Sequence, residues 1–187
     1  MPVTSTHLKQ LLERFDPPDP QQRSDLRRMF ELVEIDGDPA DRYLFDPGHF
    51  TAGGFVASPN GAGVLLIHHQ KIGKWLQPGG HIEPDDLSLE HAIRREVEEE
   101  TGLAAMESLG LLDIDIHQFP ARSDDPAHLH FDVRFGFRAM SGLIEAGDGT
   151  NEVRWIPFGE VSRWNPELSV TRPASALRSR LSAEPDC

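Results

Sequence analysis

Two segments in the middle of the chain alternate hydrophobic and polar residues. The first covers residues 112–117, with the sequence Leu-Asp-Ile-Asp-Ile-His, and the second covers residues 129–138, where Leu, Phe and Val fill the odd positions. Successive side chains of a β-strand point to opposite faces of its sheet, so a period of two is typical of a half-buried strand. The pattern therefore predicts two strands, each with one buried face.

Shorter apolar runs predict three more strands. Residues 50–57 and 64–69 have strand-like sequences, and the turn sequence Ser58-Pro59-Asn60-Gly61 between them indicates a β-hairpin. A further strand is expected at residues 152–156.

Helical spacing of apolar residues marks the remaining elements. At the N-terminus it predicts two short helices, over residues 4–15 and 21–35, separated by a proline-rich turn. Further helices are expected at residues 88–101, 158–163 and 174–181. Strands mixed with helices predict an α/β fold, in which residues 1–48 form an N-terminal helical extension and connector and residues 49–187 form the main domain. The extension is a packing appendage, a dimerisation arm or a substrate lid, and the packing interpretation is favoured.

The composition narrows the classes of function. A net charge of −13 over 187 residues argues against a long nucleic acid as partner, since phosphate contacts need clustered Lys and Arg. Metal ions could still bridge an acidic protein to a small nucleotide. The single cysteine, Cys187, excludes an internal disulfide. No apolar run approaches the length that crosses a bilayer, so we expect no membrane partner and a cytoplasmic location, with a homodimer as one option.

The expected helix at residues 88–101 carries the strongest chemical signal. At about 100° of rotation per residue, Glu96, Glu99 and Glu100 share one face of this helix, whereas Glu98 points the other way. Carboxylates packed this closely repel each other unless a cation neutralises them, and their oxygens suit Mg²⁺ or Mn²⁺. The spacing therefore predicts a divalent-metal site.

The ordinary alternative is a solvated, glutamate-rich helix face. Glycines at both ends of the helix count against that alternative. Gly79 and Gly80 allow backbone conformations that turn a carbonyl inward as a metal ligand, and Gly102 is the expected left-handed stop after Thr101.

The same residues resemble the Nudix box, the signature of Nudix hydrolases. The second half of the box, Arg-Glu-Val-x-Glu-Glu-x-Gly-Leu over residues 95–103, is matched at every position. The first half, from Gly80 to Arg95, contains one residue more than the pattern, and only Asp85 or Asp86 meets the first glutamate of the box.

The resemblance implies an α/β/α sandwich with a mixed sheet. It also implies a Mg²⁺-dependent hydrolase, with Mn²⁺ as an alternative ion, in which metal-activated water cleaves the diphosphate linkage of a nucleoside diphosphate derivative. Glu99 and Glu100 are then metal ligands. Glu96 completes the ligand set or takes the proton from the attacking water, and Arg95 either orients a glutamate or is solvated.

Other residues are weaker candidates for the site. Glu83 is a supporting metal ligand or an exposed turn residue, and the resemblance places Glu152 where many members carry an acidic residue near the metals. His130 and Arg134 could contact the substrate, although a surface histidine and a surface salt bridge are the ordinary interpretations. His128 and His130 share a strand face at a spacing that could bind zinc, but no cysteine or second histidine motif nearby supports that interpretation.

Two other functions are compatible with this type of fold. The first is a non-catalytic nucleotide-binding or sensor module, which the intact glutamates disfavour. The second is an isoprenoid diphosphate isomerase, whose resemblance implies a Cys and Glu pair that this chain lacks. Substrate specificity is expected from residues 121–126 and from the N-terminal helices.

Overall fold

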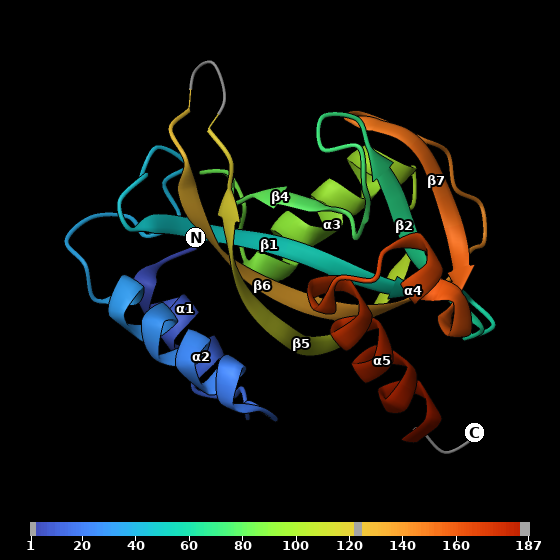
Figure 1. The fold of residues 1–187 in the computed structure, drawn as a ribbon, viewed down its shortest axis with the longest axis horizontal. Coiled ribbons are helices and arrows are strands. Elements are labelled where there is room, and N and C mark those ends of the chain that lie inside the picture. The colour runs from blue at the N-terminus through green and yellow to red at the C-terminus, as the bar shows by residue number, and fades with distance from the viewer. Residues whose placement is uncertain (1–2, 122–124, 184–187) are drawn as a thin grey trace. The chain divides into compact units, whose positions relative to one another are not determined.

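The computed structural model describes residues 3–121 and 125–183 (Figure 1). Cys187 and residues 122–124 of the expected specificity loop lie outside these ranges. In the described chain, no helix is both long and apolar enough to cross a membrane, and the cytoplasmic location stays a prediction. The helices are α1 (Ser5–Leu12), α2 (Pro20–Val33), α3 (Leu89–Thr101), η1 (Phe158–Glu160), α4 (Val161–Trp164) and α5 (Leu168–Ala183). The strands are β1 (Gly48–Ala57), β2 (Gly63–His69), β3 (Trp75–Leu76), β4 (Gly79–His81), β5 (Met106–Phe119), β6 (His128–Ala139) and β7 (Thr150–Pro157).

All expected strands belong to one sheet. Its strand order is β3-β2-β1-β6-β5, with β4 paired to β1 and β7 paired to β2. The expected hairpin is present, because β1 and β2 pair antiparallel with Ala57 opposite Val64. Ser58 closes its turn, since the Ser58 Oγ accepts hydrogen bonds from the backbone N–H groups of Ala62 and Gly63 at 3.1 and 3.0 Å. The α/β class with N-terminal helices is confirmed.

The chain divides into two compact units. The first comprises the N-terminal segment up to Ala52, Gly80–Ala92 and Ile114–Val133. The second comprises Gly53–Gly79, Ile93–Asp113 and the segment from Arg134 onward. The expected domain boundary at residues 48 and 49 stays a prediction.

The N-terminal helices are integral to the first unit. Their N-termini are capped by Thr4 and Asp19, whose side chains accept hydrogen bonds from the backbone N–H groups of His7 and Gln22. Gln22 itself is buried and donates to the carbonyl oxygen of Ile114 on β5 at 3.5 Å. Leu8, Leu12, Met29 and Leu32 provide the buried apolar stripe. These contacts support the packing interpretation, whereas the dimerisation arm stays a prediction.

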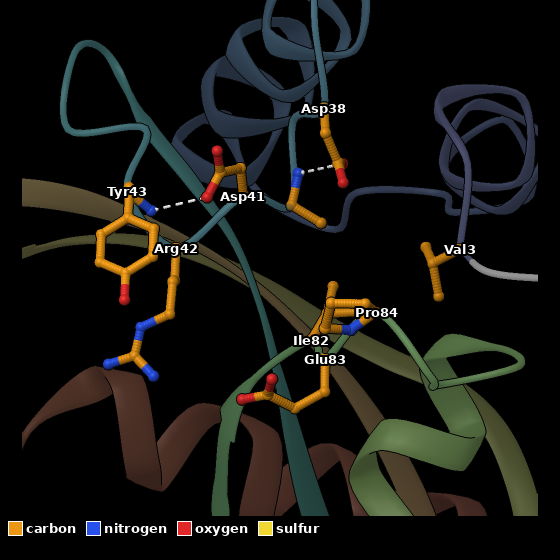
Figure 2. A pocket seen from close by; sticks show the side chains of 9 residues that line it. Val3, Asp38, Asp41, Arg42, Tyr43, Ile82, Glu83 and Pro84 are labelled. Atoms are coloured by element: carbon orange, nitrogen blue, oxygen red, sulfur yellow. Dashed lines mark hydrogen bonds between the residues drawn. The ribbon is translucent and has the colours of Figure 1, made fainter.

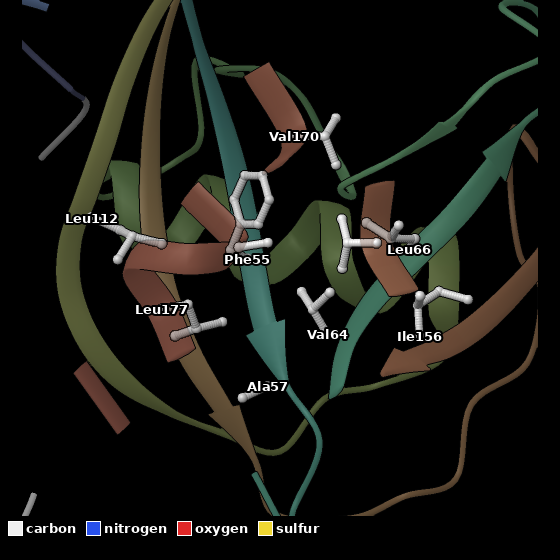
Figure 3. Close-up of a cluster of buried hydrophobic side chains, with 10 residues drawn as sticks. Phe55, Ala57, Val64, Leu66, Leu112, Ile156, Val170 and Leu177 are labelled. Carbon is white, nitrogen blue, oxygen red and sulfur yellow. The ribbon is translucent and has the colours of Figure 1, made fainter. Parts of the chain in front are cut away.

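The second unit has its own apolar core. Side chains from β1 and β2 meet those of β5, β7, α4 and α5, as Figure 3 shows. The buried members of this cluster are Phe55, Ala57, Val64, Leu66, Leu112, Ile156, Val161, Val170, Ala174 and Leu177. This core fixes the strands on which α3 is seated.

The expectation that β6 buries only one face is wrong. Nearly every residue of β6 is buried, including the polar residues His128, His130, Asp132 and Arg134. Asp132 accepts a hydrogen bond from Thr51 Oγ1 at 3.1 Å, and Arg134 donates to Asp113 Oδ2 at 3.1 Å. Polar side chains can be buried when they are paired in this way, so alternation in the sequence did not mean exposure.

Candidate active site

A turn ahead of α3 accommodates the extra residue found in the sequence. Asp86 is buried there, where its Oδ2 accepts from the Glu83 N–H at 2.8 Å and its Oδ1 lies 2.9 Å from His91 Nδ1. Ser88 Oγ then accepts from the His91 N–H at 3.0 Å, as an N-terminal helix cap does. Asp86 therefore does not face solvent, and its contacts stabilise the turn.

The apolar side of α3 sits directly on β1. A Cβ atom added to Gly54 would lie 2.8 Å from Ile93 Cγ2 and 3.0 Å from Val97 Cγ2. Only glycine allows the helix to approach the strand this closely. Because Ile93 and Val97 fix the rotation of α3, they also fix the direction of its glutamate face.

The C-terminal end of α3 is held by a loop between β6 and β7. Gly102 ends the helix with a φ of +67°, as expected. The backbone N–H groups of Glu145, Gly147 and Asp148 donate to the carbonyl oxygens of Thr101, Glu100 and Glu99, at 2.9, 3.0 and 3.0 Å. These bonds satisfy carbonyl groups that the helix end leaves free. The backbone beneath Glu99 and Glu100 is therefore anchored.

The three glutamates of the motif differ in exposure. The side chain of Glu96 is 16% exposed and that of Glu99 is 48% exposed, whereas Glu100 is only 7% exposed. Arg95 donates to Glu96 Oε1 at 2.8 Å and to Glu99 Oε2 at 3.3 Å. Arg95 thus has the ion-pair geometry that the sequence suggested. Gly79 meets the site through its N–H group, which donates to Glu100 Oε2 at 3.0 Å.

Glu100 is the most perturbed acid of the motif. Its pKa is raised to about 8, mainly by burial and also by the negative charges of Glu96 and Glu99, while the hydrogen bond from Gly79 opposes the shift. A cation beside these oxygens would favour the charged form of Glu100. The donor set, carboxylate oxygens on one helix face, therefore fits a divalent ion that prefers oxygen ligands.

The weaker candidates for site residues, Glu83, Glu152 and Arg134, each have different neighbours. Glu83 is exposed and lines a pocket of about 420 Å³ in the first unit. Figure 2 shows connector residues Asp38 to Tyr43 on one side of this pocket and Ile82 to Pro84 on the other. In the second unit, Glu152 is half exposed and forms an ion pair with Arg154. The surface salt bridge expected for Arg134 is wrong, since its side chain is 2% exposed and pairs with Asp113 inside the protein.

Histidines gather in the first unit. His49 on β1, His81 on β4 and His130 on β6 each offer a ring nitrogen, and these nitrogens lie within 4.8 Å of one another. His128 Nε2 lies 3.1 Å from His130 Nε2. The pKa of His130 is lowered to about 2, mainly by burial and also by His117 and the other neighbouring histidines. Burial also lowers the pKa of His49. The expectation of surface positions for His128 and His130 is wrong, because both are buried.

A sequence model of the NUDIX domain matches residues 47–177, a segment that includes β1, α3 and most of α5. The chain belongs to the Nudix family. The match confirms the family to which the glutamate motif pointed.

Sequence relatives of this Nudix protein are nucleotide hydrolases by name. It is 33% identical over 113 residues to a Bacillus subtilis strain 168 protein provisionally named as an 8-oxo-dGTP diphosphatase, covering 60% of this chain and 70% of the relative. It is 30% identical over 97 residues to a Lactococcus lactis subsp. cremoris protein provisionally named as a DHNTP pyrophosphohydrolase. That match covers 51% of this chain and 54% of the relative, so this chain spans about half of that protein. Both names describe cleavage of phosphate anhydrides.

Solved structures share the fold at lower identity. The NUDIX domain of Shewanella oneidensis NrtR, solved with ADP ribose, has a TM-score of 0.54 and 20% identity over 71% of this chain and 87% of that domain. An Ap4A hydrolase from C. elegans has a TM-score of 0.55 and 12% identity over 72% of this chain and 98% of that one. At these identities the likeness shows the fold alone.

The sequence did not single out His49 as a member of the histidine cluster in this Nudix hydrolase. His49 is far in sequence from His81 and His130, and no short motif joins the three. Only the pairing of β1 with both β4 and β6 brings these strands together. The number of histidines on the expected strands was a signal that could have indicated a histidine cluster.

Proposed function

We propose that this Nudix hydrolase cleaves the diphosphate linkage of a nucleoside diphosphate derivative in a Mg²⁺-dependent reaction. The observation that carries the proposal is the glutamate face of α3, where buried Glu100 lies within the electrostatic influence of Glu96 and Glu99. Three carboxylates fixed this closely are costly for a structural surface and suited to a divalent ion.

Glu99 and Glu100 would hold the ion, and Arg95 would orient Glu96 and Glu99 through its guanidinium group. A bound divalent ion supplies charge neutralisation on the diphosphate oxygens and lowers the pKa of the attacking water. Gly79 fixes Glu100 by donating its N–H to Oε2, which leaves the other oxygen of Glu100 for the ion. Glu83 is a less favoured ligand, because it lies on an exposed turn.

One glutamate must also accept the proton of the attacking water. Glu96 and Glu99 are the candidates, since both contact Arg95 and so have fixed carboxylates. Of the two, Glu96 is the more enclosed and has the shorter contact with Arg95, so its carboxylate has the more defined position for accepting a proton. We therefore assign proton acceptance to Glu96 and metal binding to Glu99 and Glu100.

The substrate is proposed as a small nucleotide. Support comes from the provisional names of the sequence relatives, an 8-oxo-dGTP diphosphatase and a DHNTP pyrophosphohydrolase. Glu152, His130 and Arg134 stay predicted substrate contacts. Among them Arg134 is the weakest, because its guanidinium group already pairs with Asp113 and donates to the Ser169 carbonyl oxygen at 2.8 Å.

A substrate screen tests the proposal. Nucleoside triphosphates, oxidised triphosphates, nucleotide sugars and dinucleoside polyphosphates are incubated with the protein in Mg²⁺ or Mn²⁺, and the products are separated by chromatography. We expect metal-dependent release of a nucleotide or pyrophosphate from one class. Tight nucleotide binding by calorimetry without turnover of any class would instead establish the non-catalytic module.

A further inference from the structure

Three strands of the first unit each contribute one histidine to a common centre. His49, His81 and His130 place ring nitrogens within 4.8 Å of one another. We propose that these three histidines bind a transition-metal ion of the Zn²⁺ class, at a site that shares no ligand with the glutamates of α3. The site goes beyond the proposed hydrolase function, because the motif does not contain these histidines and the site gives His130 a metal-binding role in place of a substrate contact.

His49 provides the strongest evidence. Its ring is fully buried, and Nδ1 lies 3.1 Å from the carbonyl oxygen of Leu44, which can only accept a hydrogen bond. Nδ1 therefore carries the proton, and Nε2 carries a lone pair. That buried Nε2 has no hydrogen-bond partner within the described chain. Leaving a buried acceptor unpaired costs free energy, and a metal ion would satisfy it.

The hydrogen bond from His49 to Leu44 also has the form of an outer-sphere contact. Metal-binding histidines almost always donate their second ring nitrogen to a carbonyl, a carboxylate or water, which fixes the tautomer and the orientation of the ring. Leu44 does this for His49 before any ion binds.

His130 is held in place by a similar chain of contacts. His128 Nε2 lies 3.1 Å from His130 Nε2, and His128 Nδ1 lies 2.8 Å from the carbonyl oxygen of Pro126. The ring of Phe119 stacks on His130 with centroids 4.8 Å apart and an interplanar angle of 17°. These neighbours restrict the rotation of His130. Because the Pro126 oxygen can only accept, His128 Nδ1 carries a proton and His128 Nε2 accepts from His130 Nε2, which leaves Nδ1 of His130 for the ion.

The donor set decides the class of ion. Neutral imidazole nitrogens suit Zn²⁺, Co²⁺, Ni²⁺ and Cu²⁺, whereas Mg²⁺ prefers oxygen ligands. Tetrahedral Zn²⁺ with Zn–N bonds of about 2.0–2.1 Å separates its ligand nitrogens by about 3.3 Å. Small side-chain rotations would close the present spacing to that value. The ion would then cross-link β1, β4 and β6 and stabilise the first unit in proportion to its occupancy.

The test uses the full chain without an affinity tag, because a polyhistidine tag would itself bind the ion. Metals are first removed with a chelator. Co²⁺ is then titrated in millimolar Mg²⁺ while its visible d–d absorption is recorded, and Zn²⁺ is added as competitor. We expect one equivalent of bound Co²⁺ that Zn²⁺ displaces and Mg²⁺ does not.

Variants assign the ligands. His81→Gln and His49→Gln should each weaken Co²⁺ binding by more than about 100-fold, since loss of even an outer-sphere partner costs about 10–100-fold. His7→Gln, on the exposed part of α1, is the matched control and should bind as the wild type does. His81 is only half buried, so its variant remains informative if the His49 variant does not fold.

Two results would overturn the site. Equal Co²⁺ affinity in the wild type and His81→Gln, or no binding by either, would leave the cluster as a stack of neutral imidazoles. Loss of Co²⁺ binding in Glu100→Gln, with retention in His81→Gln, would place the ion on α3. Because the readout is metal binding, failure of this site is distinguishable from failure of the proposed hydrolase function.

Discussion

The two groups of candidate ligands differ in how the chain assembles them. The glutamates of α3 lie within residues 96–100, carry negative charge and range from half exposed to buried. The histidines come from three strands, are largely buried and form a ligand set made of imidazole nitrogens. Ligands on one helix face are close in sequence, so their spacing can be recognised in the sequence. A site shared by strands exists only after the sheet has formed.

The Glu100→Gln variant tests most directly whether the glutamates and the histidines form two separate sites. We expect kcat to fall by about 10²–10⁴-fold, because a neutral amide cannot replace a charged metal ligand. Glu98→Gln is the matched control, since Glu98 is exposed on the same helix and points away from the motif face. The same Glu100→Gln protein should bind Co²⁺ at the histidines normally. An unchanged kcat in Glu100→Gln would refute the metal role of the glutamates.

The pH dependence of stability isolates Glu100 in a second way. Its pKa is about 8 in the folded protein against an ordinary value of 4.5. Between these two pH values the metal-free folded state therefore holds a proton that the unfolded chain has released. Stability without metal should therefore be full below pH 4.5 and fall as the pH rises toward 8, by up to several kcal/mol. Glu100→Gln should flatten this decline, and Mg²⁺ should stabilise the wild type most at the alkaline end.

Urea denaturation at constant ionic strength, with a chelator or with Mg²⁺, measures both effects. Equal slopes against pH in the wild type and Glu100→Gln would contradict the assignment of the titration to Glu100.

Gly147→Ala tests the loop that anchors α3. A Cβ atom at this position would lie 2.0 Å from the carbonyl oxygen of Glu99, so the helix end or the loop must shift. We expect a loss of about 1–3 kcal/mol in unfolding free energy and a lower kcat, because the carboxylates move with the backbone. Gly142→Ala is the control, since a Cβ atom there meets nothing within 4 Å. Equal stability of the two variants, measured by denaturation, would show that the loop is not a tether.

Arg95→Ala should have the smallest effect. The variant removes a partner of Glu96 and Glu99 without removing a ligand, so we expect up to about tenfold weaker Mg²⁺ binding by calorimetry. Arg163→Ala serves as control, because Arg163 is 78% exposed and its contact with Glu160 is 4.0 Å long. A fall in kcat as large as that expected for Glu100→Gln would instead make Arg95 part of the reacting centre.

Local signals in the sequence predicted the hairpin, α3 and its stop at Gly102. Each depends on neighbours a few residues away, such as Ser58 with Gly63 or Gly102 with Glu98. The same locality gave the glutamate face before any tertiary contact was known.

Burial along β6 could not be predicted in this way. The alternation of residues 129–138 is the same whether the polar face meets water or meets buried partners. Asp113 on β5 forms a buried ion pair with Arg134, and its Oδ1 also lies 2.9 Å from Arg172 Nε on α5. These partners are far apart in sequence, so a local pattern does not reveal them. His49 was missed for the same reason, since its partners come from β4 and β6.

The loop that anchors α3 does so through backbone N–H groups of residues 145, 147 and 148. Its side chains contribute nothing to these three bonds, so they can change during evolution without loss of the tether. Its length cannot change as freely, because one inserted residue would displace the donors from the carbonyl groups of Glu99 and Glu100. Across relatives, we therefore expect this segment to vary in composition and to keep its spacing and its glycine.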